Sequence, residues 1–289
     1  MAHKKHRITA TEMEGQTLPY PAKQSDMDIQ PQTDLSQYKA AGKLKDKVAI
    51  ITGGDSGIGR AVALGFAKEG ANVAIVYNVN DSDAETTKKM VEDVGKQCLI
   101  IKADVRQRNA CFDAVKQTVD TYGKLNILVN NAAYQHVEKK LEDITEEHLR
   151  RTFETNIYGY FFMAQAAIPH LKNGDAIINT GSIVGLTGLP ILLDYSASKG
   201  AVHTFTKSLA LQLGKRNIRV NCVIPGPVWT PNIPGTMPFD EIEKFGHEVA
   251  LERPGQPEEL APAYVLLASD DGSFMTGSLI EVTGGRLSS

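Results

Sequence analysis

The chain has 289 residues, a hydrophobic fraction of 42% and a formal net charge of −3. A charge this close to zero does not favour nucleic acid or an anionic membrane as a partner, and no apolar run approaches the roughly 20 residues that cross a bilayer. The three cysteines lie far apart, and no histidine cluster has the spacing of a zinc site, so no metal is predicted. With no apolar core after the basic N-terminus, we expect no secretory signal and a cytoplasmic location.

Residues 1–43 differ in composition from the rest of the chain. They are rich in Gln, Pro, Thr and Asp, and their few apolar residues follow no period. This composition predicts an N-terminal arm with little regular structure. Two alternatives stay open: a disordered tail, or an arm that orders against the body or a neighbouring subunit. In the second case the expected anchors are Tyr20, Ile29, Leu35 and Tyr38.

A regular pattern begins at residue 44. Residues 48–51 are a short apolar run, which predicts a buried parallel strand. Residues 52–59 then read Thr-Gly-Gly-Asp-Ser-Gly-Ile-Gly, followed by a helical pattern at 61–69 and a second strand at 72–77. The glycines allow a tight turn and a close approach of backbone to a pyrophosphate, which the start of a helix also favours. The unit therefore predicts a dinucleotide site.

Strands and helices alternate to the end of the chain. We expect further strands at about 97–101, 126–129, 175–180, 218–223 and 278–282, and helices at about 83–94, 109–122, 145–171, 195–211 and 257–268. This order predicts one α/β domain at residues 44–289, a Rossmann fold with a doubly wound parallel sheet of about seven strands. Ligands bind such sheets beyond the carboxyl ends of the strands.

Tyr195 and Lys199 are four residues apart, so they share one face of a predicted helix. A lysine ammonium near a phenol favours the phenolate and lowers the tyrosine pKa from about 10. Such a tyrosine can exchange a proton with a substrate oxygen near neutral pH. Taken alone, this spacing is more often an ordinary polar pair on an exposed helix face.

Residues 45–285 as a whole resemble the short-chain dehydrogenase/reductase family. The resemblance is carried by the loop 52–59, by Asn130-Asn131-Ala132-Ala133, by Ser182 thirteen residues before Tyr195, and by Tyr195-x-x-x-Lys199. Ala133 stands where the family usually has glycine, and Asn156 falls where it places a catalytic asparagine. The long arm and residues 54–57 are further similar to bacterial general oxidoreductases of a glucose-dehydrogenase-like subgroup with an N-terminal extension.

The resemblance implies an NAD(P)(H)-dependent oxidoreductase that interconverts an alcohol and a carbonyl. Tyr195 would be the general acid or base, and Lys199 would hold the nicotinamide ribose and lower the tyrosine pKa. Ser182 would orient the substrate oxygen, and Asn156 would hold a water that links Lys199 to solvent. The alternative is a non-catalytic dinucleotide-binding sensor or scaffold on the same fold.

The same resemblance implies the cofactor contacts. Asp104 would bind the adenine amino group, Val105 would pack on the ring and Asn130 would lie by the adenosine ribose. Thr52 and Asn131 are expected instead to brace the loop and a strand. The predicted cofactor-binding residues are Gly53, Asp55, Ser56, Gly57, Ile58, Gly59, Tyr77, Asn78, Asp104, Val105, Asn130, Ala132, Tyr195, Lys199, Pro225, Gly226, Val228 and Thr230.

The residues after the second strand bear on the choice between NAD and NADP. An acid there would bind the ribose 2′-hydroxyl and repel a 2′-phosphate. Tyr77 and Asn78 are uncharged, which favours NADP(H) slightly. Arg60 could reach the phosphate, whereas Asp81 could act as the acid if its loop folds back, so both cofactors stay open.

Two loops are expected to line the substrate cleft: the apolar segment 184–193, and the long segment 229–255, predicted to be a mobile lid. An uncharged pocket fits a small neutral alcohol, aldehyde or ketone, although the apolar loop could instead be an oligomer contact. The expected substrate-binding residues are Gln135, Ser182, Val184, Tyr195 and Trp229. The family resemblance also implies a homotetramer, packed through 145–171, 195–213 and the last strand.

Overall fold

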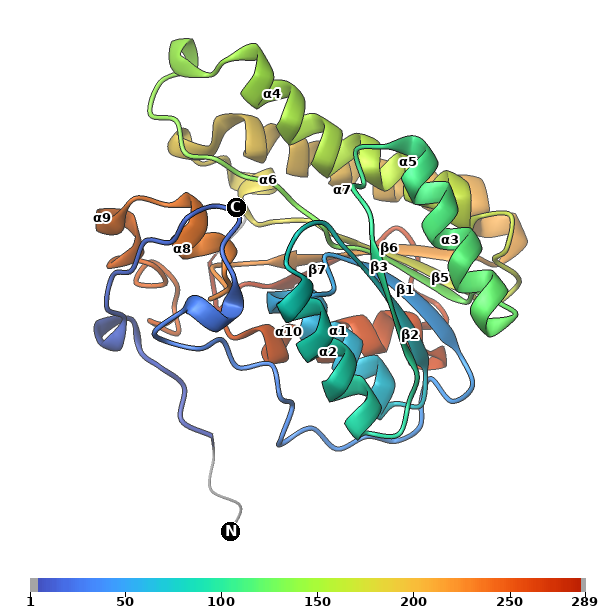
Figure 1. Ribbon diagram of the computed structural model, residues 1–289. Coiled ribbons are helices and arrows are strands. Elements are labelled where there is room, and N and C mark those ends of the chain that lie inside the picture. The colour runs from blue at the N-terminus through green and yellow to red at the C-terminus, as the bar shows by residue number, and fades with distance from the viewer. Residues whose placement is uncertain (1–4, 287–289) are drawn as a thin grey trace.

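The computed structural model describes residues 5–286, in which seven strands form one parallel sheet with the order β3-β2-β1-β4-β5-β6-β7 (Figure 1). The predicted Rossmann fold is confirmed. The strands are β1 Val48–Thr52, β2 Asn72–Tyr77, β3 Cys98–Lys102, β4 Ile127–Asn130, β5 Ala176–Thr180, β6 Arg219–Pro225 and β7 Leu279–Val282.

Helices cover both faces of the sheet (Figure 1). They are α1 Gly57–Lys68, α2 Asp81–Asp93, α3 Arg108–Tyr122, α4 Glu146–Phe153, α5 Gly159–Ala167, α6 Val184–Thr187, α7 Leu193–Leu213, α8 Asn232–Thr236, α9 Phe239–Ile242 and α10 Pro257–Ala268. Side chains alternate along each strand. Ile51 of β1 therefore packs in the layer of α1 and α10, whereas Ile50 packs in the layer of α3, α5 and α7.

The long helix predicted at 145–171 differs from the helix in the structure. Between α4 and α5 lies a π-helical turn, Glu154–Tyr158, and α5 ends at Ala167. The early end follows from Pro169, which has no backbone N–H to continue the helical hydrogen bonds. The wide turn carries Asn156 on its inner side, where the side chain is fully buried.

The described part of the arm lies along the body of its own chain. Within residues 5–43, regular structure is limited to the short 3₁₀ turns Ala10–Glu12 and Gln24–Asp26. Leu35 is buried against Ala61 and Leu64 of α1. Apolar contacts of this kind offset the entropy of ordering a segment.

A second apolar cluster places Trp229 under the arm. Trp229 is 1% exposed, packs with Met13 and Met27, and donates from Nε1 to the carbonyl of Ile29 at 2.7 Å. The segment 229–255, predicted to be a mobile lid, therefore begins at a residue fixed by the arm, and it contains α8 and α9.

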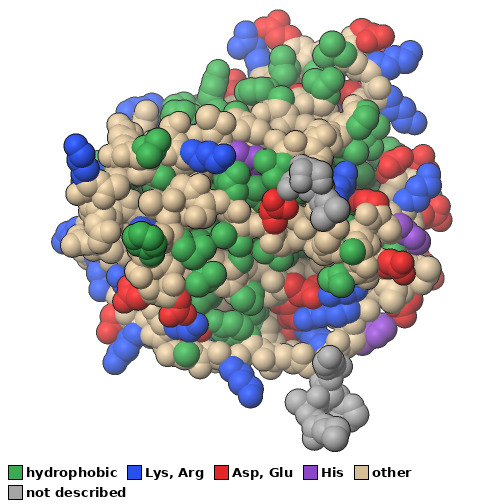
Figure 2. All heavy atoms as spheres, turned by 180° about the vertical axis from the view of Figure 1, so that it is seen from behind, with side chains coloured by type: hydrophobic (Ala, Val, Ile, Leu, Met, Phe, Trp, Pro, Cys, Tyr) green, Lys and Arg blue, Asp and Glu red, His purple; other side chains and the backbone are tan. Residues whose placement is uncertain are grey.

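The face of the molecule shown in Figure 2 has no large patch of charges of one sign. Acidic and basic side chains alternate around the edge of that face, and hydrophobic side chains show in its middle (Figure 2). Within residues 5–286, no helix combines the length and the apolar character that crossing a bilayer requires.

Candidate active site

A cavity of about 560 Å³ opens beyond the carboxyl ends of the strands, where the strand order reverses between β1 and β4. This cleft brings together most of the residues predicted from the sequence. Those that line it are Gly53, Asp55, Ser56, Gly57, Ile58, Tyr77, Asn78, Asp104, Val105, Ala132, Gln135, Ser182, Val184, Tyr195, Lys199, Pro225, Gly226, Val228 and Thr230.

Four predicted residues do not line the cleft: Gly59, Asn130, Asn156 and Trp229. A Cβ at position 59 would lie 1.9 Å from the carbonyl oxygen of Gly53, so this glycine lets helix α1 begin against the loop. Asn130 is fully buried and donates to Asn179 Oδ1 at 3.0 Å. Trp229 faces the arm, as described above. For these three residues the structure gives no support to the predicted contact with a ligand.

The glycine loop is held open toward the cleft by its neighbours. Gly53 and Gly57 have φ values of +62° and +49°, a region that side chains disfavour. The Thr52 hydroxyl accepts hydrogen bonds from the backbone N–H groups of Asn131 and Ala132 at 2.9 and 3.0 Å. The Asn131 side chain in turn donates to the carbonyl of Gly53 at 3.1 Å. Thr52 and Asn131 therefore brace the loop, as expected.

Neither charged residue proposed near the 2′ position is available there. Arg60 is 5% exposed, and its guanidinium donates to the backbone carbonyl of Asp55 and to Asp83. Asp81 accepts from the Tyr77 hydroxyl at 2.9 Å and pairs with Lys102. Both side chains therefore already have partners, so the structure gives no support to a phosphate contact for Arg60 or a ribose contact for Asp81.

Tyr195 and Ser182 meet in the wall of the cleft. Burial raises the pKa of Tyr195 to about 12, and the hydrogen bond with the Ser182 side chain lowers it in part. The sequence predicted the opposite direction, through the charge of Lys199. Burial outweighs that charge, since the ammonium lies 5.6 Å from the centre of the Tyr195 ring. At neutral pH the phenol is therefore protonated and able to donate.

Lys199 is 1% exposed, which is rare for a lysine. Its ammonium donates to the carbonyl oxygen of Thr180 at 2.8 Å and to the Tyr160 hydroxyl at 3.4 Å. Burial lowers the pKa of Lys199 to about 8. This amine is therefore mostly protonated at pH 7 and becomes mostly neutral above about pH 8.

Asn156 acts from behind the cleft. Its side chain accepts from the backbone N–H of Tyr134 at 2.8 Å and donates to the carbonyl of the same residue at 2.9 Å. It also donates to the Ser198 hydroxyl at 2.9 Å. These bonds join the segment after β4 to the helix that carries Tyr195 and Lys199. This geometry makes Asn156 a positioning residue. Its side chain does not line the cleft, where a residue in contact with substrate would lie.

The sequence analysis missed the contribution of the arm to the cleft. Tyr20, Pro21 and Ala22 line it beside the glycine loop. The Tyr20 ring meets the Tyr134 ring edge-on at 5.5 Å, and the Arg151 guanidinium lies over both rings. Tyr20 was expected to be an anchor, but nothing in the local sequence of the arm indicates which part of the body it reaches.

The next residues of the arm bind the loops on the other side of the cleft. The Asn80 side chain donates to the carbonyl of Ala22 at 3.1 Å, and the backbone N–H of Gln24 donates to Asp83 at 2.8 Å. The Gln24 side chain accepts from the backbone N–H of Gly57, the first residue of α1, at 2.9 Å. Residues 20–24 thus run from Tyr134 to the loop after β2 and form one wall of the cleft.

The sequence and the fold of the chain are similar to those of known proteins. A family model described as enoyl-(acyl carrier protein) reductase matches residues 53–286. A glucose and ribitol dehydrogenase of Daucus carota is 46% identical over 273 residues, which cover 92% of this chain and 94% of that protein. A chloroplastic NADPH-dependent aldehyde reductase of Arabidopsis thaliana is 44% identical over 274 residues, 92% of this chain and 95% of that protein.

Among solved structures, a short-chain dehydrogenase from Burkholderia cenocepacia J2315 in complex with NADP has a TM-score of 0.78 at 32% identity, over 84% of this chain and 98% of that one. The chain belongs to the short-chain dehydrogenase/reductase family. It is an NAD(P)(H)-dependent oxidoreductase that acts on CH–OH and C=O groups, and these relatives give no support to the non-catalytic alternative.

The residues present fit a dinucleotide. The loop at 53–58 faces the cleft without side chains at Gly53 and Gly57, and the backbone N–H groups at the start of α1 favour phosphate. Asp104, which is expected to bind the adenine, lines the cleft, and its carboxylate accepts a hydrogen bond from Arg106 at 2.6 Å. Lys199 would hold ribose hydroxyls, since its ammonium is the cation beside Tyr195.

We expect the buried charge of Lys199 to lower the stability of the wild-type protein below pH 8. In the unfolded chain the lysine has an ordinary pKa near 10.5, so between pH 8 and 10.5 the unfolded state binds the extra proton and stability rises with pH. The free energy of unfolding of the wild type should therefore gain roughly 3 kcal/mol relative to Lys199→Met over that interval. Urea unfolding of both proteins across pH 7–11 measures the difference. A difference that stays constant with pH would show that the lysine pKa is not lowered.

We expect Tyr20→Ala to release the dinucleotide faster, because the variant loses the aromatic contacts that hold residues 20–24 against Tyr134. Contacts of this kind contribute about 0.5–1.5 kcal/mol, so dissociation should accelerate roughly 2- to 10-fold. Stopped-flow fluorescence of bound NADPH measures the rate. Phe274→Ala, which removes a fully exposed aromatic ring, serves as the control. Equal rates in Tyr20→Ala and wild type would contradict a role of the arm in retaining the cofactor.

Proposed function

We propose that the protein reduces a small neutral aldehyde or ketone to the alcohol with NADPH. The observation that carries this proposal is the protonated Tyr195 beside Ser182, at the end of a cleft with an apolar wall. A phenol with a pKa of about 12 is a proton donor at neutral pH, whereas alcohol oxidation needs it as an acceptor. Carbonyl reduction uses the protonated phenol, the form that burial favours near pH 7, whereas oxidation uses the phenolate, which a rising pH favours.

When bound, the reduced nicotinamide supplies the hydride. The residues of the chain bind and orient the substrate and move the proton. The Ser182 hydroxyl holds the carbonyl oxygen, and the Tyr195 hydroxyl donates its proton to that oxygen as the alcohol forms. The Lys199 ammonium stabilises the phenolate that remains, and the Asn156 bonds keep the helix of both residues in register with the segment after β4.

NADPH is favoured over NADH by the uncharged end of β2. Tyr77 and Asn78 line the cleft there, and the nearest acid, Asp81, is bound to Tyr77 and Lys102. A 2′-phosphate would meet no carboxylate at this position. The aldehyde reductase of Arabidopsis thaliana is NADPH-dependent and the Burkholderia structure contains NADP, which support the same choice.

The wall beside Tyr195 favours a neutral substrate. Val184, Leu189 and Leu192 line it on one side, and Ile233 and Met237 of the segment after β6 line it on the other. Gln135 adds one amide, held by a bond to the Thr236 hydroxyl at 2.8 Å. An amide beside apolar walls fits an aldehyde or ketone with few hydroxyl groups, and the carrot relative adds sugars and polyols to the candidates.

Three buried cysteines without disulfides suit a reducing compartment such as the cytoplasm, which we propose as the location. We further propose a homotetramer. Leu149, Phe161 and Leu211 expose 43%, 43% and 85% of their surface on α4, α5 and α7. Large apolar side chains that are exposed on outer helices are typical of an interface.

We expect light scattering at micromolar concentration to give the mass of a tetramer. Leu211→Glu should shift the protein toward smaller species, because it places a charge within the proposed contact. A monomeric wild type would contradict the proposal.

We expect Tyr195→Phe to lower the turnover number about 10²- to 10⁴-fold, because the variant lacks the proton donor. Turnover is measured with NADPH on a panel of neutral aldehydes, ketones and sugars. Fluorescence titration with NADPH and NADH gives the affinity of each cofactor for both proteins. NADPH should bind more tightly than NADH, and equally well to the variant and the wild type.

Tyr158→Phe is the matched control, since Tyr158 is 52% exposed and lies outside the cleft. Retention of more than about a tenth of turnover in Tyr195→Phe would refute the proton-transfer role. Tighter binding of NADH would refute the cofactor preference alone.

A further inference from the structure

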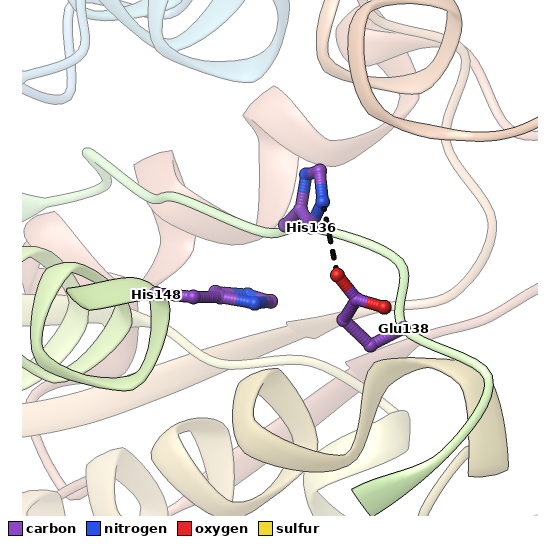
Figure 3. A group of neighbouring side chains, drawn as sticks. All are labelled: His136, Glu138 and His148. Atoms are coloured by element: carbon purple, nitrogen blue, oxygen red, sulfur yellow. Dashed lines mark ion pairs between the residues drawn. The ribbon is translucent and has the colours of Figure 1, made fainter. Parts of the chain in front are cut away.

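We propose that His136, Glu138 and His148 form a binding site for a divalent transition-metal ion, with Zn²⁺ as the best fit. The site lies outside the catalytic cleft and is independent of the function proposed above. Figure 3 shows the three side chains: His148 projects from α4, and the other two come from the connection after β4. Each offers one ligand atom, and the three atoms lie within 4.8 Å of one another.

His148 is the fixed member of the group. Its side chain is 8% exposed, and its Nδ1 atom has neither a hydrogen bond nor an ion pair with any of residues 5–286. A buried polar group without such a bond is costly, which indicates that the ring serves another partner. The Nε2 atom lies 3.2 Å from Asp194 Oδ2, and the Thr152 hydroxyl donates a hydrogen bond to the same oxygen. A carboxylate beside a histidine orients the ring in many metal sites.

His136 and Glu138 are the movable members. Their side chains are 50% and 29% exposed, and His136 Nε2 lies 3.5 Å from Glu138 Oε1. Ligands of a zinc ion sit about 2.0–2.2 Å from the metal, so they lie roughly 3.3 Å from one another. The pair already has this separation, and small side-chain rotations would bring both toward the fixed His148. Exposed side chains make such rotations at little cost.

The donor set selects the kind of ion. Two imidazole nitrogens and one carboxylate oxygen suit zinc and its neighbours, whereas magnesium and calcium prefer oxygen ligands alone. Three protein ligands leave a coordination position for water. The outer side of His136 and Glu138 also borders a shallow hollow formed with Thr17 and Leu18 of the arm. Solvent can therefore reach the site, which an ion needs to enter.

The sequence did not reveal this group because its members are not a motif. His136 and Glu138 are two residues apart, and His148 follows ten residues later, in the first turn of α4. The fold brings the start of α4 next to the segment after β4. The rings of His136 and His148 are therefore in edge-on contact, with 4.8 Å between their centres. An ion at this place would tie the β4–α4 connection to α4.

The test is metal binding by the untagged full-length protein after removal of metals with a chelator. Calorimetric titration with ZnCl₂ should give one ion per chain, and Co²⁺ should give the visible absorption of a site with nitrogen ligands. His136→Ala and Glu138→Gln change exposed side chains and should fold normally. Each should weaken Zn²⁺ binding at least about tenfold and remove the Co²⁺ absorption.

His6→Ala is the matched control, because His6 and Glu12 form another histidine–glutamate pair, 3.3 Å apart and without a buried histidine. It should leave the affinity unchanged. Equal Zn²⁺ affinities in wild type, His136→Ala and Glu138→Gln would overturn the proposal, and the pair would then be an ordinary surface ion pair. Loss of binding in His6→Ala with retention in the other two would equally overturn it, by moving the site to the arm.

Discussion

The chemistry of the cleft depends on one buried ammonium. Lys199 has lost nearly all contact with water, and the carbonyl of Thr180 and the hydroxyl of Tyr160 replace part of its hydration. Those two partners lie at the end of β5 and on α5, so the sheet and the helix layer must both be in place before the charge can be accommodated. Burial then separates the two pKa values, to about 8 for Lys199 and about 12 for Tyr195. The fold thus keeps a proton donor beside a cation that can stabilise its conjugate base.

The sequence was sufficient to predict those elements whose residues follow one local pattern. The strands followed from short apolar runs, and the bracing by Thr52 and Asn131 followed from their place in two motifs. Predictions lack support from the structure where a side chain has a choice of distant partners. Arg60 is close to the cleft in sequence, but Asp83 of α2 binds it elsewhere. Trp229 follows a cleft-lining residue directly, yet the arm covers it from two hundred residues away in the chain.

The sequence predicted the wrong direction for the Tyr195 pKa because it does not show how large each of two opposing effects is. A four-residue spacing predicts proximity to a cation and therefore a lowered pKa. The sequence does not give the depth of burial, which acts on the phenol in the opposite sense and here is the larger effect. The same depth lowers the lysine pKa, so both groups move toward their neutral forms. Burial that is shared by a pair has this consequence whenever it exceeds their mutual attraction.

Residues 134–136 join parts of the molecule that are far apart in the chain. The Tyr134 backbone is held by Asn156, and its ring contacts both Tyr20 of the arm and, edge-on at 6.1 Å, the ring of His148. Gln135 lines the cleft and His136 belongs to the proposed metal site. Three successive side chains therefore face the arm, the cleft and the metal ligands. Because successive residues share one backbone, an ordering of any one of them restricts the other two. The arm and the metal site would thus act on the same short segment that positions Gln135 toward the substrate.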